Sequence, residues 1–304
     1  MKPKTLRKLV AVRKKIDRAI LFLFFLGISL AFVMPTVLTL TNSLMSQTEI
    51  AANYGQVFSS VSGDAKVYVA GATNLKLIPD AVTFAQYDNV LLRNPQYLLK
   101  FWNSMILTLP IVAGQLLIAM LAAYGFARFE SKLRSIIFFT YVILMLMPYQ
   151  VTLVPNYLVS EWLGLLDTRA AIILPGIFSP FAVFILTKFM KKIPTAMIEA
   201  AKIDGANELQ IFLRICLPMS QSIVYSVAIL IFIDYWNMVE QPLVLMKKTE
   251  DLHPLSVFLS QINAGDAALA FAVASIYMVI PLLVFLYSED YIVDGVAMSG
   301  GVKG

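Results

Sequence analysis

The stretch Glu199-Ala200-Ala201-Lys202-Ile203-Asp204-Gly205, followed after nine intervening residues by Ile215-Cys216-Leu217-Pro218, decides the architecture of this chain of 304 residues. It is a polar, helix-forming insert with strongly apolar segments on both sides. We expect a helix over 196–203, with Thr195 as its N-cap. Asp204-Gly205 should end this helix, because glycine adopts the left-handed C-cap conformation at little cost.

A second short helix should follow at once. Asn207 with Gln210 three residues later is a variant of the capping box, which predicts a helix that begins there and reaches about residue 214. Leu217-Pro218 should then break the helix before the next apolar segment. The sequence therefore predicts two short helices joined at Gly205, each about 12 Å long at 1.5 Å per residue.

The predicted surface of this helix pair suits a groove in a soluble partner. Ala200 and Ala201 would allow a close approach. Four side chains would form an apolar face, namely Ile203, Ile211, Phe212 and Ile215. Four charged side chains would form its rim, namely Glu199, Lys202, Asp204 and Glu208. A helix lying on lipid would need basic residues on its polar face, whereas 199–208 carries three acids and one lysine.

Composition places the rest of the chain in a membrane. Hydrophobic residues make up 59% and charged residues only 14% of the chain, against about 25% charged residues in soluble domains. A spanning helix needs about 20 apolar residues. Six segments qualify, at about 19–41, 103–127, 135–158, 170–190, 220–245 and 267–288. The first resembles a signal peptide, but its apolar run is too long and no small-x-small cleavage site follows, so we expect a retained span. The predicted fold class is an all-α polytopic membrane protein with six transmembrane helices.

The distribution of Lys and Arg predicts the orientation. Segment 1–18 holds eight of them, and the short loop after the second span holds Arg128, Lys132 and Arg134. The loop between spans three and four holds only Arg169. By the positive-inside rule, both termini should be cytoplasmic. The net charge of +5 is then a topology signal, which gives no support to nucleic-acid binding.

This topology predicts four parts besides the first span. They are a basic cytoplasmic N-terminus (1–18), an outer segment (42–102), a membrane core (103–288) with the cytoplasmic insert 191–219, and a cytoplasmic tail (289–304). The outer segment includes the β-like run 66–70 and several aromatic residues. It would form an ordered lid, a docking surface for an external partner, or both.

Five polar or aromatic residues within the spans are candidates for a substrate pathway: Asp234, Trp236, Asn237, Gln150 and Asn156. Intramembrane acids usually line cavities, although Asp234 could also lie at the interface. Trp236 and Asn237 could contact a sugar, or serve as an interfacial anchor and a helix-end group. Gln150 and Asn156 could line the pathway or bond carbonyls freed by nearby prolines. We expect no metal site at the single His253, no catalytic residues, and a small apolar packing role for the single Cys216.

The spacing E-A-A-x3-G-x9-I-x-L-P resembles the cytoplasmic loop by which ABC importer permeases dock on their ATPases. The chain as a whole is similar to carbohydrate-type, binding-protein-dependent ABC importer permeases, in plan to the shorter permease subunit of the maltose importer. The similarity is good from about 100 to 304. Further matching segments are Asn103-Ser104, 123–129, 147–155, 163–168, Trp236-Asn237, Gln241-Pro242-Leu243 and 300–304. Two departures are an outer segment enlarged around 53–76 and four residues, where the family usually has three, between Gly295 and the terminal glycine-rich motif.

The resemblance implies an assembly in a bacterial or archaeal cytoplasmic membrane. Its other members would be a second permease subunit, giving a heterodimer, two ATPase subunits and an external solute-binding protein, with a sugar as substrate. The coupling residues would be Glu199, Ala200, Ala201, Asp204, Gly205, Ile215, Leu217 and Pro218. The tail residues Gly301, Val302, Lys303 and Gly304 would contact the ATPase.

The sequence contains no G-x4-G-K-[ST] motif, so ATP and Mg²⁺ should bind in a partner chain and no cofactor is expected in this one. A secondary transporter would explain six spans but not the cytoplasmic helix pair, and a membrane enzyme would need a clustered nucleophile or metal set. Importer permeases for amino acids, peptides or phosphate remain alternatives, although Trp236-Asn237 and Val302-Lys303-Gly304 favour carbohydrate.

Overall fold

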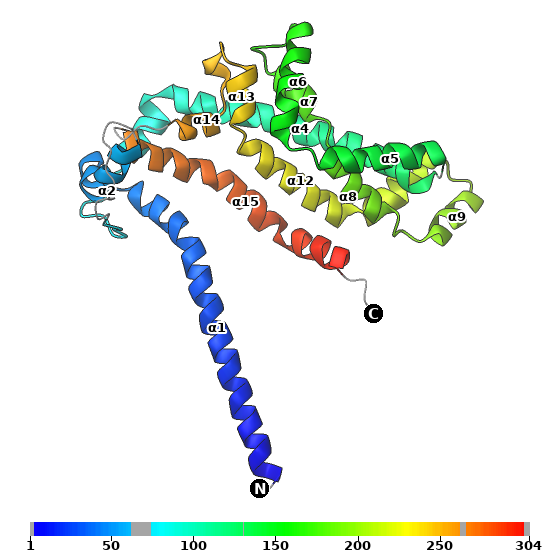
Figure 1. Cartoon of the computed structure of the whole chain (residues 1–304), viewed down its shortest axis with the longest axis horizontal. Helices are drawn as coiled ribbons and strands as arrows, with labels where there is room; N and C mark the ends of the chain where they lie inside the picture. The colour runs from blue at the N-terminus through cyan, green and yellow to red at the C-terminus, as the bar shows by residue number, and fades with distance from the viewer. Residues whose placement is uncertain (1–2, 62–73, 130, 262–265, 301–304) are drawn as a thin grey trace. The chain divides into compact units, whose positions relative to one another are not determined.

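The computed structural model describes residues 3–61, 74–129, 131–261 and 266–300, which fold into helices without any strand among them (Figure 1). The longer helices are α1 (Pro3–Asn42), α2 (Gln47–Val61), α4 (Pro95–Arg128), α5 (Lys132–Met145), α6 (Tyr149–Trp162), α8 (Pro180–Met190), α9 (Thr195–Ile203), α12 (Gln221–Trp236) and α15 (Ala267–Gly300). Shorter ones are α3 (Ala85–Asp88), η1 (Asn89–Arg93), α7 (Ala170–Gly176), α10 (Glu208–Ile211), η2 (Phe212–Cys216), α11 (Leu217–Met219), α13 (Glu240–Leu245), η3 (Glu250–Leu252) and α14 (Leu255–Ser260). The predicted β-like run 66–70 lies outside the described residues.

Among the described residues, four segments are long and apolar enough to cross a membrane, or up to six if each of two bent helix pairs forms one span. The four are Asp17–Asn42, Pro95–Arg128, Ala170–Met190 and Ala267–Glu289. The bent pairs are α5 with α6, at 106°, and Glu208–Met219 with α12, at 75°. An all-α polytopic membrane fold is therefore confirmed, while the count of six stays a prediction.

The predicted third span, 135–158, is not one straight helix. It divides at Met147 and Pro148, where Pro148 has extended backbone angles (φ −66°, ψ 145°) before α6 begins at Tyr149. Proline disfavours the helical conformation of the residue before it, which favours an end of α5 before Met147. A window of hydropathy does not detect such an elbow, because the apolar composition runs on across it.

Other expected boundaries also move. Span 170–190 consists of α7 and α8, and α8 begins anew where the Ser179 side chain accepts from Ala182 N (3.3 Å). Span 220–245 likewise consists of α12 and α13. Helix α4 begins eight residues before the expected 103, with the Asn94 side chain as its cap. Helix α15 continues to Gly300, so most of the expected tail 289–304 is helical.

The chain divides into two compact units. Unit 2 comprises 94–261 and 276–304, and α4 is its central helix, packed against α7, α8 and α12. One buried cluster joins α4, α8 and α12 to the insert 191–219, and a second joins α4 and α7 to the segment 238–246. Gly114 on α4 permits the close approach of Ile177, the residue that follows α7, because a Cβ at position 114 would lie 2.5 Å from Ile177 Cγ2.

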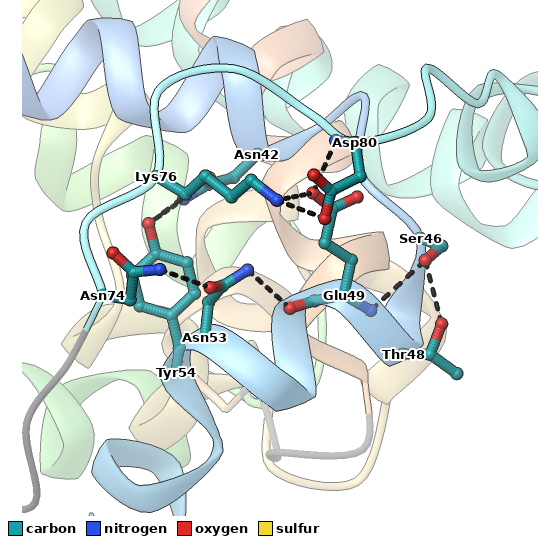
Figure 2. Close-up of polar contacts among 9 residues, drawn as sticks. All are labelled: Asn42, Ser46, Thr48, Glu49, Asn53, Tyr54, Asn74, Lys76 and Asp80. Atoms are coloured by element: carbon teal, nitrogen blue, oxygen red, sulfur yellow. Dashed lines mark hydrogen bonds and ion pairs between the residues drawn. The ribbon is translucent and has the colours of Figure 1, made fainter.

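Unit 1 comprises 1–93 and 262–275 and is held together by polar contacts (Figure 2). Lys76 forms ion pairs with Glu49 (3.1 Å) and with Asp80, and Asp80 N donates to Glu49 Oε1 (2.8 Å). The Asn74 side chain donates to that of Asn53 (3.2 Å). These contacts draw the segment 74–80 against α2.

Unit 1 also brings together the end of one candidate span and the start of another. Met45 and Ile50, just beyond the end of α1, pack fully buried against Ala267 and Ala268 at the start of α15. Ala268 N donates to Gln47 Oε1 (2.9 Å). The end of α1 and the start of α15 are therefore in contact within unit 1.

Candidate functional site

The insert 191–219 contains the two predicted short helices, α9 and α10. In Figure 1, α9 lies at the end of unit 2 opposite α14. Helix α9 ends as predicted at Asp204 and Gly205, with Gly205 at φ +81°. Gly205 N donates to Lys202 O (3.1 Å) and Ala206 N to Ala201 O (2.9 Å), which is the hydrogen-bond pattern of a Schellman motif. Thr195, however, is the first helical residue, and Pro194 occupies the cap position without a side-chain bond, so the predicted Thr195 N-cap is wrong.

The capping box of the second helix is confirmed. Asn207 Oδ1 accepts from Gln210 N, and Gln210 Oε1 accepts from Asn207 N, both at 2.9 Å. The predicted break at Leu217-Pro218 is wrong: α10 continues through the π-helical turn η2 and α11, and the chain bends at Ser220. Helices accommodate proline through such irregular turns, and here the π-helical turn comes directly before Leu217 and Pro218.

The expected apolar docking face is mostly turned inward. Ile211 and Phe212 are buried in the cluster that joins α4, α8 and α12, and Ile215 is half-buried against it. Of the four expected residues only Ile203 is freely exposed, at 86%. Ala201 also packs on that cluster, whereas Ala200 is exposed. The four predicted residues therefore belong to two faces of the insert. Ile203 is on the exposed face, and Ile211, Phe212 and Ile215 are on the face that packs on the core.

The exposed apolar side chains of the insert are instead Met197, Ile203, Leu209, Leu213 and Met219. Leu209 and Leu213 are four residues apart, as are Ile211 and Ile215, so each pair lies on its own helix face. The sequence contained this signal, but it did not say which face was turned inward. Glu199, Asp204 and Pro218 are exposed, and Leu217 is half-buried.

Polar contacts connect the insert to the end of α4. The Tyr124 hydroxyl donates to Glu208 Oε2, and Lys202 Nζ forms an ion pair with Glu208 Oε1 (2.8 Å). Arg128 Nη2 donates to Met190 O (3.1 Å) at the end of α8. A cavity of about 420 Å³ opens here, and Glu199, Lys202 and Glu208 contribute to its lining. Sequence reasoning missed Tyr124 and Arg128, because they are far from the insert in the chain.

A second cavity, of about 560 Å³, lies between the α5–α6 elbow, α7, α8 and α12. Of the five candidate pathway residues, Asp234 and Asn156 line it. Sequence reasoning did not assign five further polar lining residues to the pathway, namely Tyr149, Thr152, Ser179, Tyr235 and Gln241. Gln150 does not line this cavity and donates instead to Glu240 at the start of α13 (3.3 Å). Asn237 is exposed and donates to Ile233 O (2.8 Å) at the end of α12.

Trp236 is a core residue and cannot offer a stacking surface to a sugar. It is fully buried, and its ring stacks on Phe232 at 5.3 Å and on Tyr277 at 5.1 Å between centroids. The Tyr277 hydroxyl donates to the Trp236 carbonyl. Because neighbouring rings are stacked against Trp236, we no longer consider it a candidate pathway residue.

Within the described ranges no group of three or more His, Cys, Asp and Glu side chains is placed to bind a metal. His253 is buried, and its Nε2 donates to Met246 O (2.8 Å). Cys216 is a buried free thiol. The tail residues 301–304 lie outside the described residues.

Comparison with known proteins identifies the family of this chain. Residues 115–296 match the family described as the binding-protein-dependent transport system inner membrane component. The chain belongs to this family. It is therefore the permease component of a binding-protein-dependent importer, and it crosses the membrane more than once. Such a permease works with an ATPase and a solute-binding protein.

Curated relatives cover most of the permease. It is 28% identical to the arabinooligosaccharides transport system permease protein AraQ of Bacillus subtilis, over 94% of this chain and 96% of that protein. It is 32% identical to the lactose transport system permease protein LacG of Rhizobium radiobacter, over 77% and 88%. A chain from the crystal structure of a bacterial ABC transporter involved in the import of the acidic polysaccharide alginate has a TM-score of 0.73 at 21% identity, covering 92% and 98% of the two chains. This structural match supports the fold.

Proposed function

We propose that this permease moves a sugar or an oligosaccharide from an external solute-binding protein into the cytoplasm by alternating access, driven by ATP hydrolysis in a partner chain. The observation that carries the proposal is the insert 191–219, a capped helix pair with a glycine hinge, in a chain of this family. Relatives named for arabinooligosaccharides and lactose support the carbohydrate class.

The assembly that we propose contains a second permease, giving a heterodimer, two ATPase subunits that bind ATP and Mg²⁺, and one solute-binding protein. It would lie in a bacterial or archaeal cytoplasmic membrane with both termini inside. Two features support this orientation: the basic segment 1–18, and the packing of the end of α1 against the start of α15, which would leave those two span ends on one side.

The docking surface for the ATPase would consist of exposed groups on the insert. Ile203, Met197 and Leu209 offer apolar side chains, while Glu199 and Asp204 offer carboxylates around them. Ala200 would allow close approach, and Gly205 would fix the angle between the helices. Ala201 and Ile215 pack against the core and would hold the surface in place, while the half-buried Leu217 and the exposed Pro218 would support the turn before α12. The tail residues Gly301, Val302, Lys303 and Gly304 would make a second contact with the ATPase.

The substrate pathway would include the cavity of about 560 Å³, which is of the size that small-molecule sites usually have. Tyr149 and Tyr235 offer aromatic surfaces, and Asp234, Asn156 and Gln241 offer hydrogen-bonding groups. This mixture suits the alternating apolar faces and hydroxyl groups of a sugar. Asn237 and Gln150 would lie along the same route outside this cavity.

The outer segment 42–102 would receive the solute-binding protein. Its length far exceeds what is needed to join two helices, since most connections run about 4–6 residues. Cysteines at Ser59 and Ser62 should cross-link to the loaded binding protein from outside. If neither cysteine reacts with an impermeant reagent, the proposed topology and the docking role both fail.

The decisive experiment reverses one charge on the proposed docking surface. Glu199→Lys in the reconstituted importer should reduce ATPase association about tenfold and abolish sugar uptake, while leaving membrane insertion intact. Glu161→Lys, at another exposed carboxylate in unit 2, is the matched control and should change neither. Wild-type association and uptake in Glu199→Lys would refute the docking surface. The same association measurement on a chain lacking 299–304 tests the tail.

The substrate class is tested separately. Purified importer with its solute-binding protein should accumulate labelled disaccharides or oligosaccharides in proteoliposomes that are supplied with ATP. Accumulation of amino acids, peptides or phosphate in place of sugars would overturn the carbohydrate assignment without affecting the rest.

A further inference from the structure

Three polar groups from three helices meet beside the insert. Tyr124 belongs to α4, Lys202 to the last turn of α9, and Glu208 is the first residue of α10. One oxygen of the Glu208 carboxylate accepts from the Tyr124 hydroxyl, and the other pairs with Lys202 at 2.8 Å. We call this set the Tyr124–Glu208–Lys202 junction. It connects both arms of the insert to the central helix of unit 2.

The Tyr124 end of the junction is buried and packed against aromatic rings. Its side chain is 8% exposed, and its ring packs edge-on against Phe212 (5.2 Å between centroids) and Phe129 (6.1 Å). The Lys202 end is open, with 52% of that side chain exposed. Glu208 therefore links an exposed side chain of α9 to a buried hydroxyl of α4. Charge-assisted hydrogen bonds of this kind are stronger than neutral ones.

Helix α4 continues from the junction to the larger cavity. Gln115 lies nine residues before Tyr124, about 13 Å along an α-helix. Its Nε2 donates to Gly176 O (3.1 Å), and the Tyr235 hydroxyl donates to the same oxygen (3.4 Å). Gly176 and Tyr235 both line the cavity of about 560 Å³. Helix α4 thus contacts the insert near one end and the cavity wall further along.

We propose that Tyr124, Glu208 and Lys202 are positioning residues that transmit displacement of the insert to α4, and through Gln115 to the cavity wall. This inference rests on the proposed coupling role of the insert. The junction does not contact the ATPase in this proposal, so it should affect the transmission of movement and not the strength of docking.

The test removes single polar groups in the complete reconstituted importer. Tyr124→Phe and Glu208→Gln should each leave ATPase association within about twofold of wild type. Stimulation of ATP hydrolysis by loaded binding protein, and the sugar imported per ATP, should fall about fivefold or more, the lower end of ordinary coupling between two sites. The double variant should be no worse than the stronger single variant if the two groups act as one unit. Tyr141→Phe, a half-buried tyrosine on α5, is the matched control and should behave as wild type.

The outcomes separate this inference from the proposed function. If Glu199→Lys weakens ATPase association while Tyr124→Phe and Glu208→Gln keep wild-type stimulation, docking stands and the junction is refuted. If both junction variants lose association in parallel with stimulation, they act on the shape of the docking surface, and transmission through α4 is refuted. If Glu199→Lys has no effect, the docking surface itself fails.

Discussion

Gly205 shows at the scale of one residue how the insert is built. Its φ of +81° lies in the left-handed region, and a Cβ added there would meet no atom within 4 Å. The need for glycine is therefore purely one of backbone conformation. This conformation lets Gly205 and Ala206 donate to carbonyls of the last turn of α9, which fixes the direction in which α10 leaves.

We predict that Gly205→Val strains the insert by about 1–2 kcal/mol, because a β-branched side chain disfavours the left-handed conformation. Sugar uptake should fall several-fold while the chain still inserts in the membrane. Gly125→Ala is the control, since its added Cβ also meets no atom but no positive φ is involved. Uptake assays in proteoliposomes decide, and equal uptake by the two variants would show that the hinge angle is unimportant.

Residue-level prediction from sequence succeeded where the chemistry is local. The Gly205 cap and the Asn207–Gln210 box depend on bonds within a few residues, and both are present. It failed for Trp236, whose burial depends on Tyr277 some forty residues further along. It also failed for Ile211 and Phe212, because composition alone cannot say which face of a short helix meets the core.

At the scale of elements, the α5–α6 elbow shapes the larger cavity. Leu144, Met145 and Met147 line the cavity from one side of the elbow, and Tyr149, Thr152 and Asn156 from the other. The 106° bend between the two helices is what lets both arms contribute.

Pro148→Ala should restore a backbone N–H and release Met147 to continue α5. We expect the elbow to open, sugar uptake to fall several-fold, and ATPase association to stay unchanged, because the insert is not involved. Pro155→Ala is the matched control, since Pro155 lies inside α6, is exposed and does not line the cavity. An unchanged distance between spin labels on α5 and α6 in Pro148→Ala would contradict the role of the proline.

The long helices were predictable because their apolar runs are as long as a spanning helix requires. Helices α1, α4 and α15 contain the expected spans 19–41, 103–127 and 267–288. Their breaks were less predictable. Pro148 and Ser179-Pro180 are visible helix-stop and helix-start signals, but hydropathy continues across both. The signal for the bend at Ser220 is displaced, because the chain passes Pro218 as helix and turns two residues later.

At the scale of the whole molecule, a cluster of charged side chains joins the segment 74–80 to α2 in unit 1. The neighbouring Asp80 carboxylate, and then Glu49, raise the pKa of Lys76 above its ordinary value of 10.5. A lysine with a raised pKa in the folded state contributes stability that is complete below the unfolded pKa. That contribution is lost as pH rises through the folded pKa.

We therefore expect the segment 74–80 to loosen only in strongly alkaline solution, above about pH 10.5. Cleavage of this segment by added subtilisin should accelerate there beyond the intrinsic rate on an unfolded peptide. Lys76→Met is the control: it should be cleaved faster at neutral pH and show no further alkaline step. A wild-type profile identical to that of Lys76→Met would show that the ion pairs do not hold the segment.

The packing of Met45 and Ile50 against Ala267 and Ala268 has a consequence for biosynthesis. The two halves of this contact are separated by more than two hundred residues, so a ribosome finishes the second half long after the first has left it. Until α15 is inserted, the end of α1 has no apolar partner from that helix, and the Gln47 side chain has not yet received the Ala268 amide. Unit 1 is thus completed only when α15 has been made, and a chain that stops before Ala267 lacks the apolar partners of Met45 and Ile50.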